Sequence, residues 1–321
     1  MLLQDLGMAL TNRLVALPPV DVPEGTLTSL GDRGSTYVVD LPGPTPDAPA
    51  VLLLHPLGCT GRLGWFPSLA ALNQRFRVVV MDQRWHGQGI CTDRFRLADC
   101  ADDAAALITA LGLDPVIVAG YSMGSVVAQM TWFRHRDLVG GLVLCASTDD
   151  FRHGTSERWF HTGMGLTMAG LRGVAYARSE AMAARAQRQA QRTHPVDDLH
   201  GWALEEFRST SPWAVGQALG KLGRFSSRDW IGGVDVPSAV VVLGRDRAIP
   251  ADRQRALAMA IPGATMHEVD GGHASCVLGH DQFVPVLQEA CQSVAARIHD
   301  QVDDGRRRRP GLLARTRRLL A

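Results

Sequence analysis

The chain contains 321 residues, of which 46% are hydrophobic, and its formal net charge at pH 7 is +1. A balance this close to neutral excludes a protein that binds nucleic acid or an anionic surface through its overall charge. The hydrophobic content is ample for the core of a single-sheet α/β enzyme that carries an insertion.

The cysteines and the apolar segments indicate in which cellular compartment the protein is expected. The six cysteines show neither a Cys-x-x-Cys pair nor regular spacing, so we expect free core residues in a reducing compartment. The first ten residues lack a basic leader, and no stretch approaches the roughly 18–20 apolar residues that span a bilayer. A cytoplasmic protein is therefore expected.

The N-terminal part combines a leader with the first strands. Residues 1–25 predict a short amphipathic leader that ends in a Pro-rich stretch. Residues 26–41 predict a β-hairpin, because the Gly-Asp-Arg-Gly sequence at 31–34 is typical of a turn. A Pro-rich loop at 42–49 then leads to a first inner strand at 51–54.

Strand and helix patterns alternate from that point on. Strands are expected at 77–81, 116–119, 142–146, 239–243 and 265–269, and helices at 97–111 and 123–135. Such alternation predicts an α/β fold with a mostly parallel sheet and helices on both faces. Ligands bind such a sheet at the carboxyl ends of its strands.

A Gly-Tyr-Ser-Met-Gly sequence at 120–124 lies where a predicted strand hands over to a predicted helix. Gly-x-Ser-x-Gly in this context is the nucleophile elbow of an acyl-transfer enzyme. The glycines leave room for a strained backbone at Ser122, and the helix N-terminus beside it favours developing negative charge. Ser122 is therefore the candidate nucleophile.

Three further segments follow strand ends in a fixed order. The loop at 55–58 can supply one oxyanion-hole N–H, from Leu57, and the residue after the nucleophile, Met123, can supply the other. Asp246 lies just past the strand at 239–243, and His273 lies on a glycine-flanked loop. The order Ser, Asp, His is that of α/β-hydrolases.

On these motifs the chain resembles serine α/β-hydrolases of the esterase, haloperoxidase-like and proline-iminopeptidase-like group over roughly residues 26–300. The sequence 82–89 is similar to the family's D-x-R-G-H-G-x-S loop, but Trp85 stands where glycine is usual and Gly89 where serine is usual. A His55-Pro56 pair replaces the commoner His-Gly, which stiffens the loop and removes one N–H.

The resemblance implies how the chain is divided. The core is expected at 26–148 and 236–300, with an α/β-hydrolase fold. Residues 149–235 hold scattered aromatics and an Ala/Arg/Gln-rich helical stretch at 169–191, and are expected to form a helical cap over the site. The predicted substrate-pocket residues are His55, Gly58, Tyr121, Trp159 and Trp213.

The proposed chemistry assigns one role to each group. Ser122 attacks the acyl carbon, His273 takes its proton as general base, and Asp246 orients the imidazole. Asp149 and Asp150 follow another strand end and are the alternative positions for the acid. No metal or organic cofactor is required. Elsewhere in the loops, Asp82 and Arg84 are expected to form a structural pair, and His55 and His86 to support loops.

Several alternatives stay open on sequence alone. A carboxylic ester is the default small-molecule substrate, while amide, peptide or carbon–carbon cleavage would use the same triad. A non-enzymatic ligand-binding protein on the same fold is the alternative of a different class. The Arg-rich tail at 301–321 predicts either a solvated end or an amphipathic segment that contacts anionic lipid or an acidic partner. The oligomeric state is left open.

Overall fold

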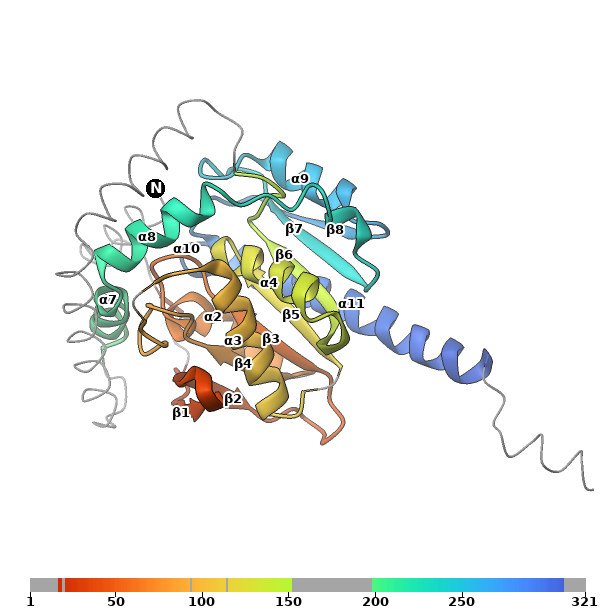
Figure 1. Cartoon of the computed structure of the whole chain (residues 1–321), viewed down its shortest axis with the longest axis horizontal. Coiled ribbons are helices and arrows are strands. Elements are labelled where there is room, and N and C mark those ends of the chain that lie inside the picture. Colours follow the sequence, from red (N-terminus) through yellow and green to blue (C-terminus); the bar gives the residue numbers. More distant parts are fainter. Residues whose placement is uncertain (1–16, 19–20, 93, 114, 152–197, 309–321) are drawn as a thin grey trace, which may run out of the picture.

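The computed structural model describes residues 17–18, 21–92, 94–113, 115–151 and 198–308. Eight strands form one sheet in the order β1-β2-β4-β3-β5-β6-β7-β8 (Figure 1). Their bounds are Thr26–Ser29 (β1), Ser35–Leu41 (β2), Ala50–Leu54 (β3), Arg77–Met81 (β4), Val116–Tyr121 (β5), Val139–Cys145 (β6), Ser238–Leu243 (β7) and Thr265–Val269 (β8). Strand β2 is antiparallel to β1 and β4, and all other neighbours are parallel, which confirms the predicted mostly parallel sheet.

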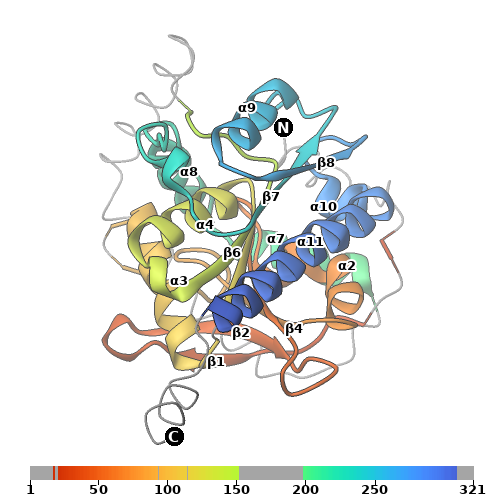
Figure 2. The ribbon, with the colours of Figure 1, turned by 90° about the vertical axis from the view of Figure 1, so that its right-hand side faces the viewer.

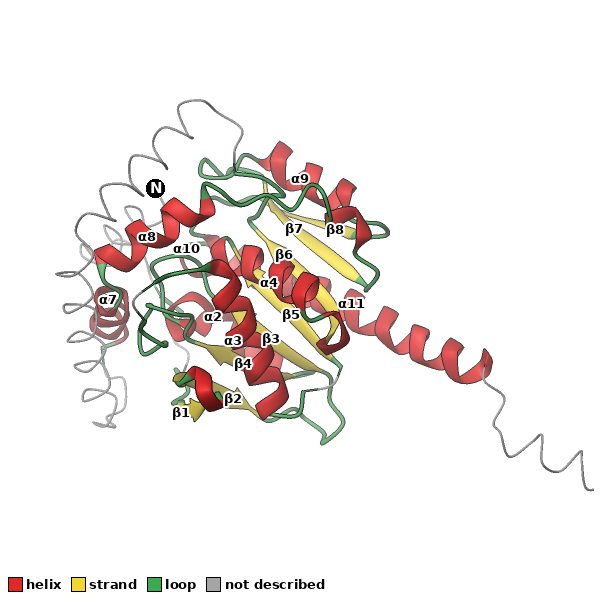
Figure 3. Cartoon of the chain, viewed as in Figure 1, coloured by secondary structure: helices red, strands yellow, loops and turns green. Residues whose placement is uncertain are grey.

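Helices cover both faces of this sheet, as predicted (Figures 2 and 3). The described helices are Gly61–Asn73 (α2), Leu97–Ala110 (α3), Met123–Arg134 (α4), Leu199–Ser209 (α7), Pro212–Leu222 (α8), Ala251–Ala260 (α9), Ser275–Leu278 (α10) and His280–Arg308 (α11), with 3-10 turns at Gly31–Arg33, Arg136–Leu138 and Ile231–Gly233. Along β3, Leu52 and Leu54 pack in the apolar cluster that contains α3 and α4, whereas Val51 and Leu53 pack in the one that contains α2 and α11. The inner strands are therefore buried on both sides, as their continuous apolar runs require.

Helix α2 is the main element that the sequence pattern misses. Two glycines and Pro67 weaken its helical signal. Tertiary contacts explain them: a Cβ on Gly61 would lie 2.8 Å from the Met81 carbonyl oxygen, and one on Gly64 2.9 Å from Pro56. Thr60 caps the helix by accepting the Leu63 N–H at 3.1 Å. Close packing on the sheet therefore selects residues that disfavour an isolated helix.

The segment between β6 and β7 is predicted as the cap. Its described residues contain α7, α8 and one 3-10 turn, and its two ends run together through an isolated bridge between Asp150 and Ser226. The Ser227 N–H donates to the Asp149 carbonyl at 2.7 Å beside this bridge. The predicted helix at 169–191 lies outside the described residues, so the cap assignment for 149–235 stays a prediction.

The ends of the chain and the cysteines complete the fold. Most of the predicted leader and residues 309–321 of the Arg-rich tail lie outside the described residues, whereas residues 301–308 continue α11, which extends away from the body of the molecule (Figure 1). The six cysteines are free thiols, and all but Cys91 are buried.

Within the described ranges, we find no helix of the length and apolarity that a membrane crossing needs.

One close backbone approach joins α4 to the sheet. Strands β3 and β5 are parallel neighbours in which Leu54 pairs with Gly120. A Cβ on Gly124 would lie 2.0 Å from the Leu54 carbonyl oxygen, and one on Gly120 would lie 2.3 Å from the Gly124 backbone. Neither glycine can be replaced without moving the helix.

We expect Gly124→Ala to lower the free energy of unfolding by at least about 3 kcal/mol, the upper end of ordinary overpacking costs, because backbone and not a flexible side chain opposes the new methyl group. Gly233→Ala is the matched control, since a Cβ there meets no atom within 4 Å. Urea unfolding checks both, and equal stabilities of the two variants would contradict the packing argument.

Candidate active site

Ser122 occupies the turn between β5 and α4 in a strained conformation, with φ 54° and ψ −113°. Positive φ is uncommon for residues other than glycine and marks a position that its surroundings hold in place. The Ser122 N–H donates to the Cys145 carbonyl at 2.9 Å. The Ser125 hydroxyl lies 2.6 Å from the Gly120 carbonyl oxygen and accepts the Cys145 N–H at 3.0 Å. Ser125, which the sequence analysis did not single out, thus ties the turn to β6.

Three side chains from distant parts of the chain form one hydrogen-bonded series. His273 Nε2 lies 2.9 Å from Ser122 Oγ, and His273 Nδ1 lies 2.6 Å from Asp246 Oδ2. Because an ionised carboxylate only accepts, Nδ1 carries the proton, which leaves Nε2 free to accept the serine hydroxyl. The three residues are only 7–8% exposed. The structure therefore brings together the three residues that the sequence predicts as a triad.

Asp246 receives four hydrogen bonds from residues that the structure describes. Its Oδ1 accepts the N–H groups of Ala248 at 2.7 Å and Ile249 at 2.9 Å, and its Oδ2 accepts the Gln254 side-chain amide at 3.1 Å besides His273. A buried carboxylate needs such partners to remain charged. Gln254 was not among the predicted site residues. Its helical spacing from the apolar Leu257 and Ala258, shortly after Pro250, is a signal that could have drawn attention to it.

Tyr121 lies beneath the histidine loop and does not point into a pocket, in contrast to its predicted place. Its ring belongs to the apolar cluster on the α2 and α11 side, where it packs edge-on against Trp65 and Phe283. Its hydroxyl donates to the His273 carbonyl at 3.1 Å. Successive residues of a strand face opposite sides of the sheet, so the residue before Ser122 turns toward the core. Burial raises the pKa of the Tyr121 phenol, which therefore stays a donor.

The two predicted oxyanion donors lie at equivalent positions beyond two neighbouring strands. Leu54 pairs with Gly120 at the ends of β3 and β5, and Leu57 and Met123 each lie three residues beyond that pair. Both side chains belong to the same buried cluster. In the described part of the chain, neither N–H group donates to another protein atom. Two unused N–H donors thus follow adjacent strand ends beside Ser122.

His55 lies behind this loop and is fully buried, so the structure does not place it as the pocket residue that was predicted. Its Nδ1 donates to the Pro56 carbonyl at 2.9 Å, and its Nε2 accepts the Gln83 N–H at 2.9 Å. Burial lowers the pKa of His55 well below its usual range, so the ring is neutral. Gly58, in the same loop, is buried with φ 77°, a conformation that favours glycine.

The expected pair between Asp82 and Arg84 is wrong. Asp82 instead accepts the N–H groups of Gly61 at 2.7 Å and Gln88 at 2.8 Å. Arg84 donates to Asp103 on α3, with one nitrogen–oxygen distance of 2.9 Å. The two side chains diverge because the chain turns at Arg84, which breaks the extended geometry that would place residues i and i+2 on one side. Burial, and then the nearby Glu206, raise the pKa of Asp82 to about 7.

Trp85 departs from the family loop, whereas the neighbouring His86 matches it. Trp85 has φ 65°, which explains why glycine is usual at that position. His86 Nδ1 donates to the Arg84 carbonyl at 2.8 Å. Burial lowers the pKa of His86 to about 4, so this ring is neutral at physiological pH. Both histidines of the region, His55 and His86, therefore support loops as expected.

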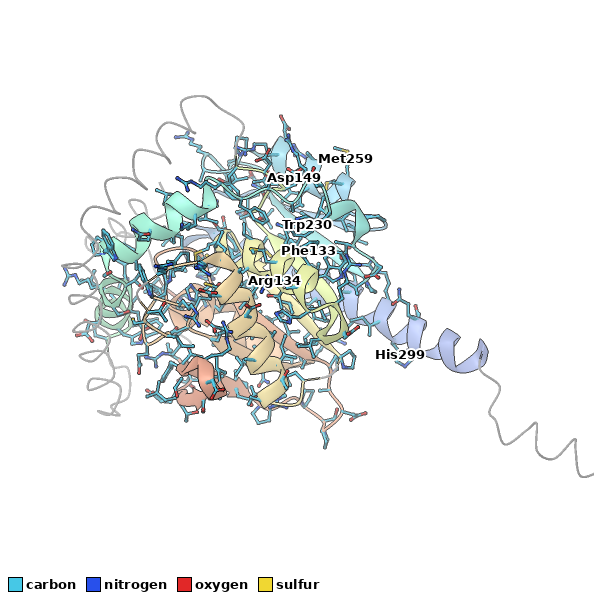
Figure 4. The ribbon with its side chains drawn as sticks, viewed as in Figure 1. Phe133, Arg134, Asp149, Trp230, Met259 and His299 are labelled. Carbon is cyan, nitrogen blue, oxygen red and sulfur yellow. The ribbon has the colours of Figure 1, made fainter. Side chains whose placement is uncertain are left out.

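The alternative acids, Asp149 and Asp150, pair with an arginine. Arg228 pairs with Asp149 and with Asp150, each at 3.3 Å, and Asp149 is seen in Figure 4 on the same side of the molecule as Phe133 and Trp230. His273 Nδ1 bonds to Asp246. The hydrogen bonds thus favour Asp246 over both alternatives.

The segment that leads from the insertion back to β7 crosses α4. Trp230 stacks on Phe133 with ring centroids 4.4 Å apart and lies 6.2 Å from Trp132 (Figure 4). These contacts fix the returning segment on the outer face of α4, on its way to β7. Trp230 therefore packs on α4 and makes no ring contact with Ser122, Asp246 or His273 in the described part of the chain.

Helix α7 and the turn after it dock on two loops at the carboxyl edge of the sheet. Glu206 accepts hydrogen bonds from Thr60 and from Arg62, the latter at 2.6 Å. The Gly87 N–H donates to the Thr210 hydroxyl at 3.4 Å. The insertion therefore contacts the loops after β3 and β4, beside the triad.

Trp213, a predicted pocket residue, lies on α8. It is buried and belongs to the same apolar cluster as Leu57 and Met123. Trp159, the other predicted aromatic of the pocket, lies outside the described residues. Among the residues that the structure describes, no three His, Cys, Asp or Glu side chains are grouped to hold a metal ion.

Comparison with known proteins agrees with this architecture. A family described as alpha/beta hydrolase fold matches residues 49–279, more than half of the chain. A pimeloyl-(acyl-carrier protein) methyl ester esterase of Chromobacterium violaceum is 30% identical over 254 residues, which cover 77% of this chain and 96% of that protein. A putative carbamate hydrolase of Yersinia enterocolitica is 26% identical, over 76% of this chain and 87% of its own length.

Among solved structures, a thermophilic esterase from Thermogutta terrifontis superimposes with a TM-score of 0.64 at 23% identity, covering 85% of this chain and 99% of that one. At this identity the likeness concerns the fold alone. Together with the family match and the 30% identical relative, it leads to one assignment. The chain belongs to the α/β-hydrolase fold family.

Proposed function

We propose that the protein is a serine hydrolase that cleaves a carboxylic ester through an acyl-enzyme intermediate. The observation that carries the proposal is the unbroken series of hydrogen bonds from Ser122 through His273 to Asp246, at 2.9 Å and 2.6 Å. A nucleophile, a base and a group that orients the base are the parts that such catalysis needs.

In the proposed reaction, Ser122 Oγ attacks the acyl carbon while His273 Nε2 accepts its proton. The N–H groups of Leu57 and Met123 stabilise the oxyanion, and losing one such donor typically costs about 3 kcal/mol. His273 then protonates the leaving alcohol, and the ester bond breaks. Water attacks the acyl-enzyme with His273 again as base, which releases the acid and restores Ser122. Asp246 stabilises the imidazolium in both steps.

The choice of an ester rests on chemistry and on the relatives. The C. violaceum relative is named as a methyl ester esterase and the Y. enterocolitica relative as a putative carbamate hydrolase. Both names describe attack on a carbonyl carbon that bears a heteroatom leaving group. The carbamate relative keeps cleavage of a carbon–nitrogen bond as the alternative, which would use the same three residues. A complete triad argues against a purely ligand-binding role.

Ser122→Ala removes the attacking oxygen and leaves the glycines of the turn in place. We expect the variant to fold, to lose labelling by a fluorophosphonate probe, and to lose roughly 10⁴-fold or more in ester turnover. Ser293→Ala, on α11, is the control and should label like the wild type. A Ser122→Ala protein that keeps more than a tenth of wild-type turnover would exclude Ser122 as nucleophile.

Asp246→Asn should lower kcat by roughly 10³- to 10⁴-fold, because an amide favours the wrong imidazole tautomer. Asp149→Asn should stay within about twofold of the wild type, since its carboxylate pairs with Arg228 and not with the histidine. Steady-state kinetics on one ester, with circular dichroism as the folding control, compares the two. The opposite ranking would move the acid to the loop after β6.

Trp213→Phe should change selectivity between acyl chains, because α8 packs in the cluster that holds both predicted oxyanion residues. We expect kcat/KM for long-chain esters to rise relative to acetate esters by about 10-fold, the worth of one or two methylene-sized contacts. Trp230→Phe, which stacks on the outer face of α4, should leave that ratio unchanged. Equal loss on all chain lengths in the folded Trp213 variant would show that this residue serves packing alone.

A further inference from the structure

Gln254 is a buried polar residue in the first turn of α9, on the face that also buries Leu257 and Ala258. Its side chain makes three hydrogen bonds. Oε1 accepts the Leu243 N–H at 3.0 Å, and Nε2 donates to the Ile249 carbonyl at 2.7 Å and to Asp246 Oδ2 at 3.1 Å. Because this side chain is fully buried and both of its polar atoms are hydrogen-bonded, it makes the surrounding loop more rigid.

The amide of Gln254 has only one workable orientation. Flipping it would set Nε2 against the Leu243 N–H and Oε1 against the Ile249 carbonyl, so that a donor meets a donor and an acceptor meets an acceptor. The end of β7 and the loop after it therefore fix which atom faces Asp246. That atom is an N–H donor.

Resting on the proposed function, we propose that Gln254 is a positioning residue for the reaction: its fixed amide donor holds Asp246 so that Oδ2 faces His273 Nδ1. Oδ1 is held by the N–H groups of Ala248 and Ile249. Within the described ranges, Oδ2 has two hydrogen-bond partners, His273 and Gln254. Rotation of the carboxyl group is locked from both sides.

Two arginines near this loop have partners other than Asp246. Arg245 pairs with Asp270 at 2.8 Å, and Arg253 donates to the Asp150 carbonyl. Asp246 is thus held by neutral donors together with the imidazole. A neutral donor fixes the geometry of the carboxylate without competing with the imidazolium for its charge, whereas an arginine there would pair with the charge itself.

The test is a double-mutant cycle with Gln254→Glu and Asp246→Asn. Glutamate keeps the size of the side chain and the acceptor for the Leu243 N–H, but it replaces the donor to Asp246 by a second carboxylate. It also loses the hydrogen bond to the Ile249 carbonyl, a loss that is common to both backgrounds. In Asp246→Asn, the two backbone donors on Oδ1 hold the new carbonyl oxygen, so the new NH₂ occupies the place of Oδ2 and confronts Gln254 Nε2. There, Gln254→Glu would supply the missing acceptor.

We expect Gln254→Glu to lower kcat about 10- to 100-fold in the Asp246 background, as the loss of a hydrogen bond to a charged group predicts, with KM changed by less than about twofold. In the Asp246→Asn background the same substitution should change kcat by less than about twofold or raise it. A residue that only stabilises the fold would lower activity by the same factor in both backgrounds.

Gln129→Glu is the matched control. Gln129 is equally buried and also joins loops, since it donates to the Thr148 carbonyl at 3.3 Å and accepts the Ser227 hydroxyl at 2.8 Å, but it has no bond to the triad. Its kcat should stay within about twofold of the wild type. Thermal melts of all variants separate lost folding from lost positioning. If Gln254→Glu does not fold, Gln254→Met in the same two backgrounds removes the donor without adding charge.

The outcomes distinguish this inference from the proposed function. If the wild type takes up no fluorophosphonate probe and Ser122→Ala changes nothing, the serine-hydrolase proposal fails. If the wild type is labelled and Ser122→Ala is inactive, but the Gln254 substitution costs the same in both backgrounds or costs nothing in a folded protein, positioning by Gln254 is overturned. A loss that depends on the residue at 246 supports it.

Discussion

The site depends on a close backbone contact between the first turn of α4 and the end of β3. Because β3 and β5 are adjacent parallel strands, the helix that follows β5 must start against the Leu54 carbonyl, and only glycine at 124 fits there. This approach sets the tight turn in which Ser122 takes a positive φ. It also places the loop after β3, which contains the predicted oxyanion residue Leu57, next to the turn of Ser122. The turn of the candidate nucleophile and the placement of that loop therefore have one physical cause.

Strand order then brings the remaining groups to the same edge. β5, β6, β7 and β8 are consecutive neighbours, so the loops after β5, β7 and β8 all lie at the carboxyl edge although His273 is 151 residues from Ser122 in sequence. Among the described residues, the donors to the buried Asp246 carboxylate are two backbone N–H groups, the Gln254 amide and the His273 ring, and these four hydrogen bonds offset its loss of hydration. In the part of the chain that the structure describes, the Asp246 carboxylate is therefore stabilised by fixed N–H dipoles and the histidine ring, and not by an arginine or lysine.

The three histidines near this edge differ by their partners. His55 and His86 are fully buried, and burial lowers the pKa of each, to about 4 for His86, so both rings stay neutral and bond to backbone. His273 alone of the three bonds to both a carboxylate and a hydroxyl. The polar contacts of Glu206 with Thr60 and Arg62 tie the insertion to the start of α2 and to the end of the loop after β3, which contains the predicted oxyanion residue Leu57. Changes in how α7 docks would therefore reach the site through that loop.

The sequence by itself determined the elements whose signals are local. The strands predicted at 77–81 and 265–269 agree with β4 and β8, and the glycines at 120 and 124 predict the turn at Ser122. Both signals are local, because hydrophobic periodicity and turn chemistry depend on only a few consecutive residues. The order Ser, Asp, His also follows from local strand ends. Tertiary structure alone decided that Tyr121 faces the core, that Arg84 pairs with Asp103 and not Asp82, that Gly64 lies in a helix, and that Gln254 reaches Asp246. Each of these contacts depends on which distant element packs against the residue, and a short stretch of sequence does not determine that element.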